Sequence, residues 1–513
     1  MEKESMCRWI PDVDGFTSAA IMHKFITDNS DCNVFLGIHA GKEHGLDLEQ
    51  CLSFKPDLVI VPDASGNPND YVYLKQKEIK SCIIDHHLYP ESDFDTLIVN
   101  CNYKPYPNPH LSGAGVALKV CQYYASKFKI DYDFSELYSL AAIGMIADVM
   151  SLQELENQYI IRKGLKGIKR HEFFNELLKD HMGKPINIVT IKDIGWTIGP
   201  NLNSVIRLGT PKEKELLFET IIEPRKNIES EKRGAKGEIV PLYEEMVRIC
   251  KNLKAKQNRM VQNAIKIIEP TVNLQHNLIY YIDQDGELPF ELSGLIANKL
   301  LGEYQRPVLI LKHFHDYANP SEPDCWAGSV RSLVAEGFED PRQEMENFSG
   351  TKSAQGHKES FGLKVYKESF DSFLAEAYDK LDHIDFNNQF YTVEAEMPVK
   401  SLDNDIAKVF AHPNIWGSGL TKPLIKLNNI DCIGAMYMGT DAQHVKIMLP
   451  KIDIVVFNNE ELVEIFKESK QYEMEAIGEL GYNEWDGQQR LQLIVKDYSL
   501  SPKKNTEWSI YDF

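Results

Sequence analysis

The sequence predicts an α/β protein in four parts: a domain with a parallel sheet, a helical connector, a smaller α/β domain and a C-terminal β-barrel. Three observations support this. Apolar runs that end on acidic residues recur in the first 150 residues, as in parallel strands that open into a polar site. Charged sequence with helical periodicity follows to about residue 269, and period-two alternation is common after residue 388. We expect the parts to span 1–210, 211–270, 271–387 and 388–513.

Length and composition narrow the class of protein. At 513 residues the chain exceeds a single core, and its 43% hydrophobic and 26% charged content is ordinary for a globular protein. No apolar run approaches the roughly 20 residues of a membrane span, and Met1–Ser5 has no apolar signal segment. Nine dispersed cysteines predict reduced thiols and a cytoplasmic location. A net charge of −20 disfavours indiscriminate nucleic-acid binding but allows a local basic channel.

Acids and histidines stand at the ends of predicted elements. The segment Ile83–His87 runs from two apolar residues into an aspartate and two histidines, and Asp63 ends the apolar run 57–62. Asp12 and Asp14 lie in a strand-to-helix turn, where two such acids can converge on one or two hard cations, although the motif taken alone favours a simple Asp-Gly turn. Asp148 lies in the apolar, helical segment 140–149. Burying it unpaired would cost roughly several kcal/mol, so a metal cation is the natural compensation.

Oxygen and imidazole ligands of this kind suit Mn²⁺ or Mg²⁺ better than structural zinc. The candidate metal ligands are Asp12, Asp14, Asp63, His86 and Asp148. Four acids and a histidine are too many for one ordinary ion. We therefore expect two ions about 3.5–4 Å apart, bridged by Asp63, which is the usual arrangement for in-line attack on phosphorus.

These motifs resemble those of the DHH phosphoesterase superfamily: Asp12-x-Asp14-Gly15, the strand-end Asp63, Asp85-His86-His87 and Ala147-Asp148. The resemblance narrows to RecJ-type single-strand DNA-specific exonucleases through three further segments: 111–117, 144–152 and 193–208. It covers nearly the whole chain. Some positions depart from the family pattern and suggest a divergent, phage-type member: Arg8 for a histidine ligand, Ile10 for an acid, Asn201 for the first arginine of Gly-Pro-Arg, Ile206 for a glycine, and Gln355 for a glycine.

The resemblance implies a role for each site residue. Asp12 and Asp63 would hold one ion, and the other ion would be held by Asp14, Asp63, His86 and Asp148. Asp85 would orient His86, while His87 would contact phosphate.

Further motifs resemble those of the DHHA1 domain. After the strands 278–282 and 307–311, which flank a helix at 291–303, the segments 327–332 and 355–357 look like Gly-Ser-x-Arg-Ser and Gly-Gly-His. In a Gly-flanked loop there, Ser329 would donate a hydrogen bond and Arg331 would offer a bidentate fork to a phosphate. Arg207 would add a second positive group, and His357 would contact the scissile phosphate. A glycine-rich turn with a surface arginine is the alternative.

About five short strands and one helix after residue 388, beginning with the alternating stretch 390–396, predict an OB-type barrel. Trp416 and Tyr437 could stack bases there, or serve as barrel core.

The resemblance implies a metal-dependent 5′-to-3′ exonuclease on single-stranded DNA that releases mononucleotides in repair or recombination. Expected partners are single-stranded DNA and, as candidates, a single-strand-binding protein or a helicase; we expect a monomer without membrane contact. An oligonucleotide or cyclic-dinucleotide phosphodiesterase and an inactive replication scaffold are the alternatives. The predicted OB domain disfavours the first, since a dinucleotide needs no strand-tracking module, and the retained acids and histidines disfavour the second.

Overall fold

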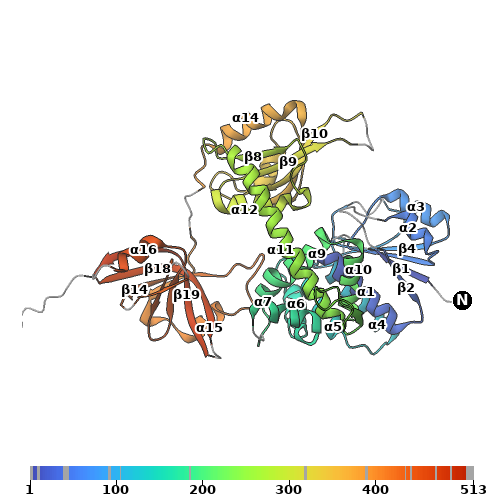
Figure 1. The fold of residues 1–513 in the computed structure, drawn as a ribbon, viewed down its shortest axis with the longest axis horizontal. Helices are drawn as coiled ribbons and strands as arrows, with labels where there is room; N and C mark the ends of the chain where they lie inside the picture. The colour runs from blue at the N-terminus through green and yellow to red at the C-terminus, as the bar shows by residue number, and fades with distance from the viewer. Residues whose placement is uncertain are drawn as a thin grey trace, which may run out of the picture. The chain divides into compact units, whose positions relative to one another are not determined.

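The structure is a computed structural model. It describes residues 4–8, 12–37, 46–89, 94–103, 106–183, 187–316, 321–386, 391–433, 435–439, 442–467, 471–485 and 488–503. These residues form two compact units (Figure 1). The first unit combines residues up to 199 with residues from 391 onward, and the second contains residues 200–386. In the described part of the chain, no helix is long and apolar enough to cross a membrane.

The first unit begins with a five-stranded parallel sheet, which confirms the predicted α/β class. Its strand order is β2-β1-β3-β4-β5, and the strands are β1 (Glu4–Arg8), β2 (Asn33–Gly37), β3 (Leu58–Pro62), β4 (Lys80–Asp85) and β5 (Leu97–Asn100). On one side, α2 (Leu48–Ser53) and α3 (Pro68–Gln76) pack through Cys51, Tyr71 and Leu74 against β3 and β4. On the other side lie α1 (Val13–Asn29) and α4 (Gly113–Phe128). Buried valines and isoleucines explain why β3 and β4 lie inside the sheet.

Helices complete the N-terminal part of this unit. α5 (Ser135–Ala147) is buried along most of its length and packs against α1, α4 and α6 (Leu155–Leu165). It confirms the helix expected near Asp148, which caps its C-terminus. After α7 (Glu172–Met182), the short α8 (Ile191–Asp193) runs into a π-helical turn at Ile194–Ile198. This turn packs against the end of α5 and leads to α9 (Gly199–Leu208).

The C-terminal part of the first unit is a seven-stranded sheet, more elaborate than the five short strands expected. The order is β13-β14-β18-β19-β17-β16-β15. Its elements are β13 (Ala395–Pro398), α15 (Asn404–Phe410), β14 (Leu424–Asp431), β15 (Ala435–Met438), β16 (His444–Met448), β17 (Asp453–Val456), α16 (Glu460–Lys467), β18 (Tyr472–Trp485) and β19 (Gln488–Pro502). The strand expected at 390–396 begins only at Ala395, and residue 390 lies outside the described residues.

The C-terminal sheet docks onto the loop that follows Asp148. The Leu152 N–H donates to the Ser418 carbonyl (2.7 Å), and Gln153 Nε2 donates to the Gly419 carbonyl (2.7 Å). Asn414 accepts a hydrogen bond from the Ile191 N–H (3.1 Å) at the start of α8. The two parts of this unit are therefore joined by one bond between backbone groups and two between a side chain and the backbone, although they are far apart in sequence.

The second unit contains the connector and the smaller α/β fold. The connector comprises α10 (Pro211–Ile222) and α11 (Leu242–Ile268), and α11 ends just before Pro270, as expected. The prediction of helices throughout 211–269 was wrong in one place: β6 (Asn227–Glu229) and β7 (Ile239–Pro241) form a hairpin. Gly234 and Gly237, with φ of 88° and 84°, turn the chain between them.

A second five-stranded sheet follows, in the order β11-β12-β10-β9-β8. Its strands are β8 (Ile279–Asp283), β9 (Val308–Phe314), β10 (Cys325–Arg331), β11 (Thr351–His357) and β12 (Ser360–Tyr366). Helix α12 (Ser293–Tyr304) packs against β9 and β10 through one face of the sheet. Helices α13 (Pro341–Glu346) and α14 (Phe370–Leu381) pack into the core on the opposite face.

Candidate metal centre

Two adjacent parallel strands bring Asp63 and His86 to the same edge of the sheet. β3 and β4 pair with Pro62 opposite Ile84, so the residues that follow these strands emerge together. The Asp63 N–H donates to the Ile84 carbonyl (2.7 Å), and Asp63 has a φ of 56°. A non-glycine residue in this left-handed region is strained, as is common for side chains held at functional sites.

The first turn of α1 supplies Asp12 and Asp14. Asp12 is the N-cap, because its carboxylate accepts a hydrogen bond from the Gly15 N–H (2.9 Å). Asp14 is buried, and its Oδ1 accepts from Ser112 Oγ (2.7 Å) and from the Ala114 N–H (3.2 Å) at the start of α4. These bonds fix one carboxylate oxygen and leave Oδ2 at 4.0 Å from His86 Nε2.

Two glycines make room for these carboxylates. A Cβ atom at Gly113 would lie 2.5 Å from Asp63 Oδ1, and one at Gly144 would lie 2.3 Å from Asp14 Oδ1. Real Cβ atoms do not approach heavy atoms this closely, so the buried position of each acid depends on a glycine on a neighbouring helix.

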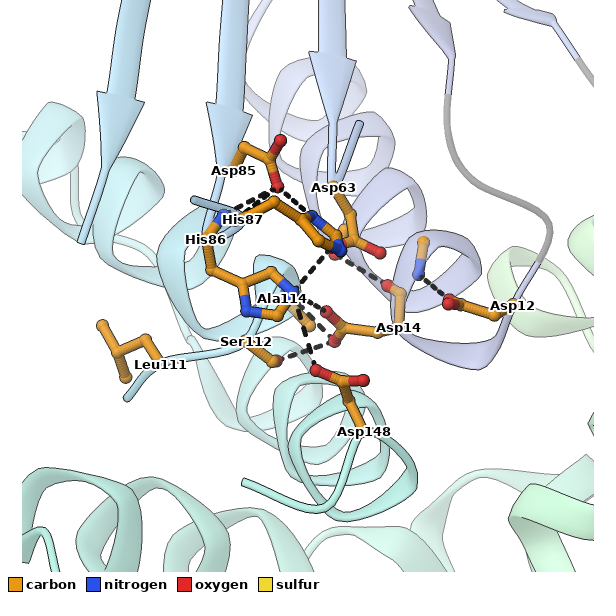
Figure 2. A network of polar contacts seen from close by, with 12 residues as sticks. Asp12, Asp14, Asp63, Asp85, His86, His87, Leu111, Ser112, Ala114 and Asp148 are labelled. Atoms are coloured by element: carbon orange, nitrogen blue, oxygen red, sulfur yellow. Dashed lines mark hydrogen bonds and ion pairs between the residues drawn. The ribbon is translucent and has the colours of Figure 1, made fainter. Parts of the chain in front are cut away.

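His86 is the point on which the acids converge (Figure 2). Its Nε2 lies 3.2 Å from Asp63 Oδ1 and 3.5 Å from Asp148 Oδ2. The His86 side chain is only 13% exposed. Potential ligand atoms lie within 4.8 Å of one another in two groups that share His86: Asp14, His86 and Asp148, and Asp63, Asp85, His86 and His87. The structure thus brings together four of the five predicted ligands.

The fifth predicted ligand, Asp12, belongs to neither group in the described part of the chain. Its carboxylate caps α1, and it remains near enough to affect the charge of Asp63 and Asp148. Two of the predicted departures from the family pattern, Ile10 and the Arg8 side chain, lie outside the described residues.

Asp85 meets the ring of His87, while its orienting role toward His86 stays a prediction. Asp85 Oδ1 lies 2.7 Å from His87 Nδ1, and it also accepts from the backbone N–H groups of His86 (2.7 Å) and His87 (3.2 Å). It therefore fixes the backbone of the histidine pair and orients the His87 ring. The His87 side chain is half exposed, so it points to a region that a substrate can reach.

Burial and mutual repulsion dominate the electrostatics of the acids. The pKa of Asp63 is raised well above its ordinary value by burial and then by the charges of Asp14, Asp12, Asp85 and Asp148. Burial, followed by Asp14 and Asp12, raises the pKa of Asp148 to about 8, and burial raises that of Asp12 to about 6.

The Asp85–His87 pair has the opposite character. Burial opposes charge on both groups, but their hydrogen bond and mutual attraction outweigh it. The pKa of Asp85 is therefore lowered, while that of His87 rises to about 9. At neutral pH this pair is an aspartate and an imidazolium, so His87 presents a positive charge at the edge of the acidic cluster.

Family models match two parts of the chain. The DHH family N-terminal domain matches residues 7–145, and the RecJ OB domain matches residues 393–497. A protein of Bacillus subtilis (strain 168) named as an SPbeta prophage-derived single-strand DNA-specific exonuclease, YorK, is 29% identical over 430 residues, which are 82% of this chain and 73% of that protein. The two family models and this relative support a RecJ-type member of the DHH superfamily.

Further similar proteins are also RecJ exonucleases. The single-stranded-DNA-specific exonuclease RecJ of Haemophilus influenzae is 25% identical over 533 residues, covering 95% of this chain and 86% of that protein. The crystal structure of RecJ in complex with Mn²⁺ from Thermus thermophilus matches with a TM-score of 0.71 at 19% identity, over 97% of this chain and 69% of that one. A Mg²⁺ complex of the same protein matches with a TM-score of 0.63. These structural matches confirm the fold, including the C-terminal OB domain.

The donor set of this RecJ-type chain fits Mn²⁺ or Mg²⁺. Buried oxygens on four carboxylates make no hydrogen bond: Asp14 Oδ2, Asp63 Oδ1, Asp85 Oδ2 and Asp148 Oδ2. Such oxygens are costly to bury without a partner, and hard divalent cations prefer oxygen ligands. The same ions are the ones in the solved RecJ complexes. Asp14, Asp63, His86 and Asp148 are therefore the residues that would hold metal.

The predicted phosphate-binding residues Ser329 and Arg331 belong to strand β10 of the second unit. The expectation of a Gly-flanked loop was wrong, because β10 spans both residues between β9 and β12. Ser329 Oγ lies 2.8 Å from Ser293 Oγ at the first residue of α12. A Cβ at Gly294 would lie 2.6 Å from Arg331 Nη2, so this glycine lets the guanidinium lie beside the helix start.

Two other predicted residues lie in this unit. Arg207 is in the last turn of α9, and its charge, after burial, lowers the pKa of Arg331, so the two guanidinium groups share one electrostatic environment. His357 is exposed at the end of β11, where Gly356 has a φ of 131°. These placements leave the phosphate-binding roles of these residues as predictions.

The Trp416 ring is held by contacts within its own domain, so it is less accessible for base stacking than an exposed aromatic ring would be. Its indole N–H donates to the Val409 carbonyl (3.2 Å), and its ring meets Phe410 edge-on. The ring is half-buried, whereas Tyr437 on β15 is 38% exposed.

Sequence reasoning assigned no role to Ser112, Gly113, Gly144, Ser293 or Gly294. Ser112 caps α4 and Gly113 is its first residue, in a Ser-Gly-x-Gly pattern that was the available signal. The others act through contacts that only the tertiary structure reveals.

Proposed function

We propose that this chain is a metal-dependent exonuclease that hydrolyses phosphodiester bonds of single-stranded DNA in the 5′-to-3′ direction and releases mononucleotides. The observation that carries the proposal is the convergence of unpartnered, buried carboxylate oxygens on His86, at the carboxyl ends of parallel strands. The RecJ OB domain and the similarity to RecJ and YorK support single-stranded DNA as the substrate.

The residues of the chain divide the chemistry between them. Asp14, Asp63, His86 and Asp148 would hold Mn²⁺ or Mg²⁺, which would supply an activated water and would stabilise negative charge on a phosphate. Asp14 and Asp63 are held rigidly, by Ser112 and by the strand end, so they keep their carboxylates in position without substrate. His87 holds a proton on the exposed rim of the centre, where an imidazolium favours the approach of a phosphate.

Several finer statements belong to the same proposal. Asp12 and Asp63 would share one ion, and Asp14, Asp63, His86 and Asp148 the other. Arg207, Ser329 and Arg331 would bind the 5′-terminal phosphate and His357 the scissile one, while Trp416 in the OB domain would contact the strand. The proposal also includes a division into four parts at residues 210, 270 and 387, and a monomeric state. It further includes a cytoplasmic role in DNA repair or recombination, and association with a single-strand-binding protein or a helicase.

Two alternatives predict different substrates or none. A cyclic-dinucleotide or oligonucleotide phosphodiesterase has no use for the seven-stranded C-terminal sheet, which matches the RecJ OB domain. An inactive replication scaffold has no use for a cluster of buried acids that destabilises the protein without metal. Both observations favour an active nuclease on longer strands.

A single assay separates the three functions. Long single strands labelled at the 5′ or the 3′ end, matched duplexes and a cyclic dinucleotide are incubated with Mn²⁺, Mg²⁺ or EDTA, with Asp63→Ala as the inactive control. We expect metal-dependent release of labelled mononucleotide from the 5′-labelled single strand first. Faster hydrolysis of the cyclic dinucleotide would support the phosphodiesterase, and no hydrolysis by a folded protein would support the scaffold.

A further inference from the structure

The sheet of the second unit has one face that its helices cover and one that they cover only in part. Leu309, Leu311, Val330 and Leu363 point into the core formed with α13 and α14. The alternate residues point the other way, where α12 packs over β8, β9 and part of β10. Among the described elements, no helix packs on that side of β11 and β12, and Gly362 in the middle of β12 is exposed. Figure 1 shows α12 and α14 on different sides of this sheet.

This partly uncovered surface, the open face, consists of Lys312, Ala327, Ser329, Arg331, Gly362 and Lys364. Strand register arranges these residues in rows. Lys312 on β9 and Lys364 on β12 both pair with Ala327 on β10, so the two lysines flank a methyl group. Their Cα atoms are separated by two strand spacings, which is about 10 Å. Two residues further along β10, Ser329 pairs with Gly362, and Arg331 lies two residues beyond that.

The middle of the open face carries only small side chains, and a lysine and a phenylalanine lie on each side of it. Lys312 Nζ lies 4.2 Å from the centre of the Phe290 ring, and Lys364 Nζ lies 4.3 Å from that of Phe314. Both rings are half-buried, so each keeps part of its surface accessible. An extended chain could lie along β10 between these two pairs, because Ala327 and Gly362 present no bulk.

The charge of the two lysines is not neutralised by acids within the described part of the chain. Neither Lys312 nor Lys364 forms an ion pair there, whereas Lys352 and Lys380 of the same unit pair with Glu322 (2.5 Å) and Glu344 (3.1 Å). This concentration of unpaired cations is unusual for a chain with a net charge of −20. It favours a polyanion as the natural occupant of the open face.

We propose that the open face binds the backbone of a single DNA strand, with one phosphate at Lys312 and another at Lys364, and with bases stacked on Phe290 and Phe314. This extends the proposed function, because it assigns a strand-binding surface beyond the phosphate position at Ser329 and Arg331. Lysine contacts to phosphate supply affinity that depends on salt, and aromatic stacking supplies affinity that tolerates any base. The face therefore retains a strand irrespective of its sequence.

The test measures equilibrium binding of a long single strand, by fluorescence anisotropy in EDTA, as a function of salt concentration. The variants are the pair Lys312→Ala and Lys364→Ala, and the same positions changed to Arg. The matched control is Lys367→Ala with Lys380→Ala: the Lys367 ammonium lies over Trp326, on the covered side, and Lys380 lies on α14. Each lost phosphate contact should reduce the slope of log K against log salt by about 0.7 on a single strand.

We expect the alanine pair to flatten the salt slope by about 1.4 and the arginine pair and the control pair to keep the wild-type slope. Phe314→Leu should also reduce the loss of affinity that abasic positions in the strand cause for the wild type, because one of the two stacking rings is removed. Equal slopes for the alanine pair and the control pair would overturn this inference while leaving the exonuclease intact. If the wild type bound an acidic peptide as tightly as DNA, the occupant would be wrong. A wild type that neither binds nor cleaves single strands would instead overturn the proposed function.

Discussion

A Cβ atom at Gly113 would lie 2.5 Å from Asp63 Oδ1 and from Asp63 Cβ, so the side chain of Asp63 is buried against a position that accepts only glycine. The contact joins the first residue of α4 to the end of β3. It makes the geometry of the metal centre sensitive to a residue that offers no ligand atom of its own.

Gly113→Ala should therefore weaken metal binding while preserving the fold. The added methyl group must displace the Asp63 carboxylate or shift α4, and overpacking of this kind costs about 1–3 kcal/mol. If the cost falls on the metal-bound geometry, Mn²⁺ affinity should drop about tenfold or more. Calorimetric titration with Mn²⁺ measures it, and Gly302→Ala is the control, since a Cβ there meets nothing within 4 Å. Unchanged affinity in a folded Gly113→Ala protein would contradict the prediction.

Asp63→Asn should have opposite effects on stability and on metal binding. In the metal-free protein it removes a carboxyl group whose ionisation is opposed by burial and by four other aspartates, so the melting temperature should rise. In the wild type, Mn²⁺ at about 100 times its Kd should add about 2.7 kcal/mol of stability, and the variant should lose this gain. Thermal unfolding with and without Mn²⁺ tests both effects. Asp131→Asn, at an exposed position outside the cluster, is the control and should keep the full shift. A full Mn²⁺ shift in Asp63→Asn would exclude Asp63 as a ligand.

The junction between the catalytic part and the C-terminal sheet should be sensitive at Gly417. A Cβ there would lie 2.6 Å from Leu152 Cδ1, and Leu152 is buried only four residues after Asp148. Gly417→Val should lower the free energy of unfolding by about 1–3 kcal/mol, and Leu152→Ala in the same chain should restore part of it. Denaturant unfolding of the single and double variants measures the coupling. Gly481→Ala on β18, where a Cβ has space, should behave as wild type. Additive effects of the two changes would show that the residues are not in contact.

Glu245 should contribute stability that depends on pH. Burial opposes its charge, but hydrogen bonds from Arg248, the Glu231 N–H and Ser230 lower its pKa below the ordinary value. Since the folded pKa is depressed, the contribution is complete above the unfolded pKa of about 4.3 and is lost as pH falls through the folded value. Glu245→Gln should therefore cost about 1–3 kcal/mol at pH 7, and the gap should narrow below about pH 4. Urea unfolding across this range measures it. Exposed Glu244→Gln is the control, and a gap independent of pH would contradict the assignment.

The sequence predicts best what depends on neighbouring residues in the chain. Apolar runs that end on Asp63 and Asp85 identified β3, β4 and the edge at which the centre lies, because parallel strands align their carboxyl ends. Prediction from the sequence failed where contacts between residues far apart in the chain decide the local structure. Ser329 was expected in a loop because Gly328 precedes it, yet Gly328 lies in a strand whose neighbour leaves no room for a Cβ: one would lie 2.0 Å from the Ile310 carbonyl oxygen. Which histidine ring meets Asp85 depends on side-chain orientation, which adjacent positions in sequence do not determine.

Arg331 should decide whether the enzyme recognises the 5′ end of its substrate. Its guanidinium lies beside the first turn of α12, next to Ser293 and Ser329, where the positive end of the helix also favours an anion. Arg331→Ala should slow cleavage of 5′-phosphorylated strands about tenfold or more, since a hydrogen bond to a charged group contributes about 1.5–3 kcal/mol. Mn²⁺ affinity should not change, because no proposed metal ligand lies in β10.

The measurement is the initial rate on strands that differ only in a 5′-phosphate or a 5′-hydroxyl. Arg342→Ala, which removes an arginine paired with Glu346 on α13, is the control. The preference for the phosphorylated strand should narrow in Arg331→Ala alone. Equal preference in all three proteins would remove Arg331 from end recognition, and release of mononucleotides from the 3′ end by the wild type would reverse the proposed polarity.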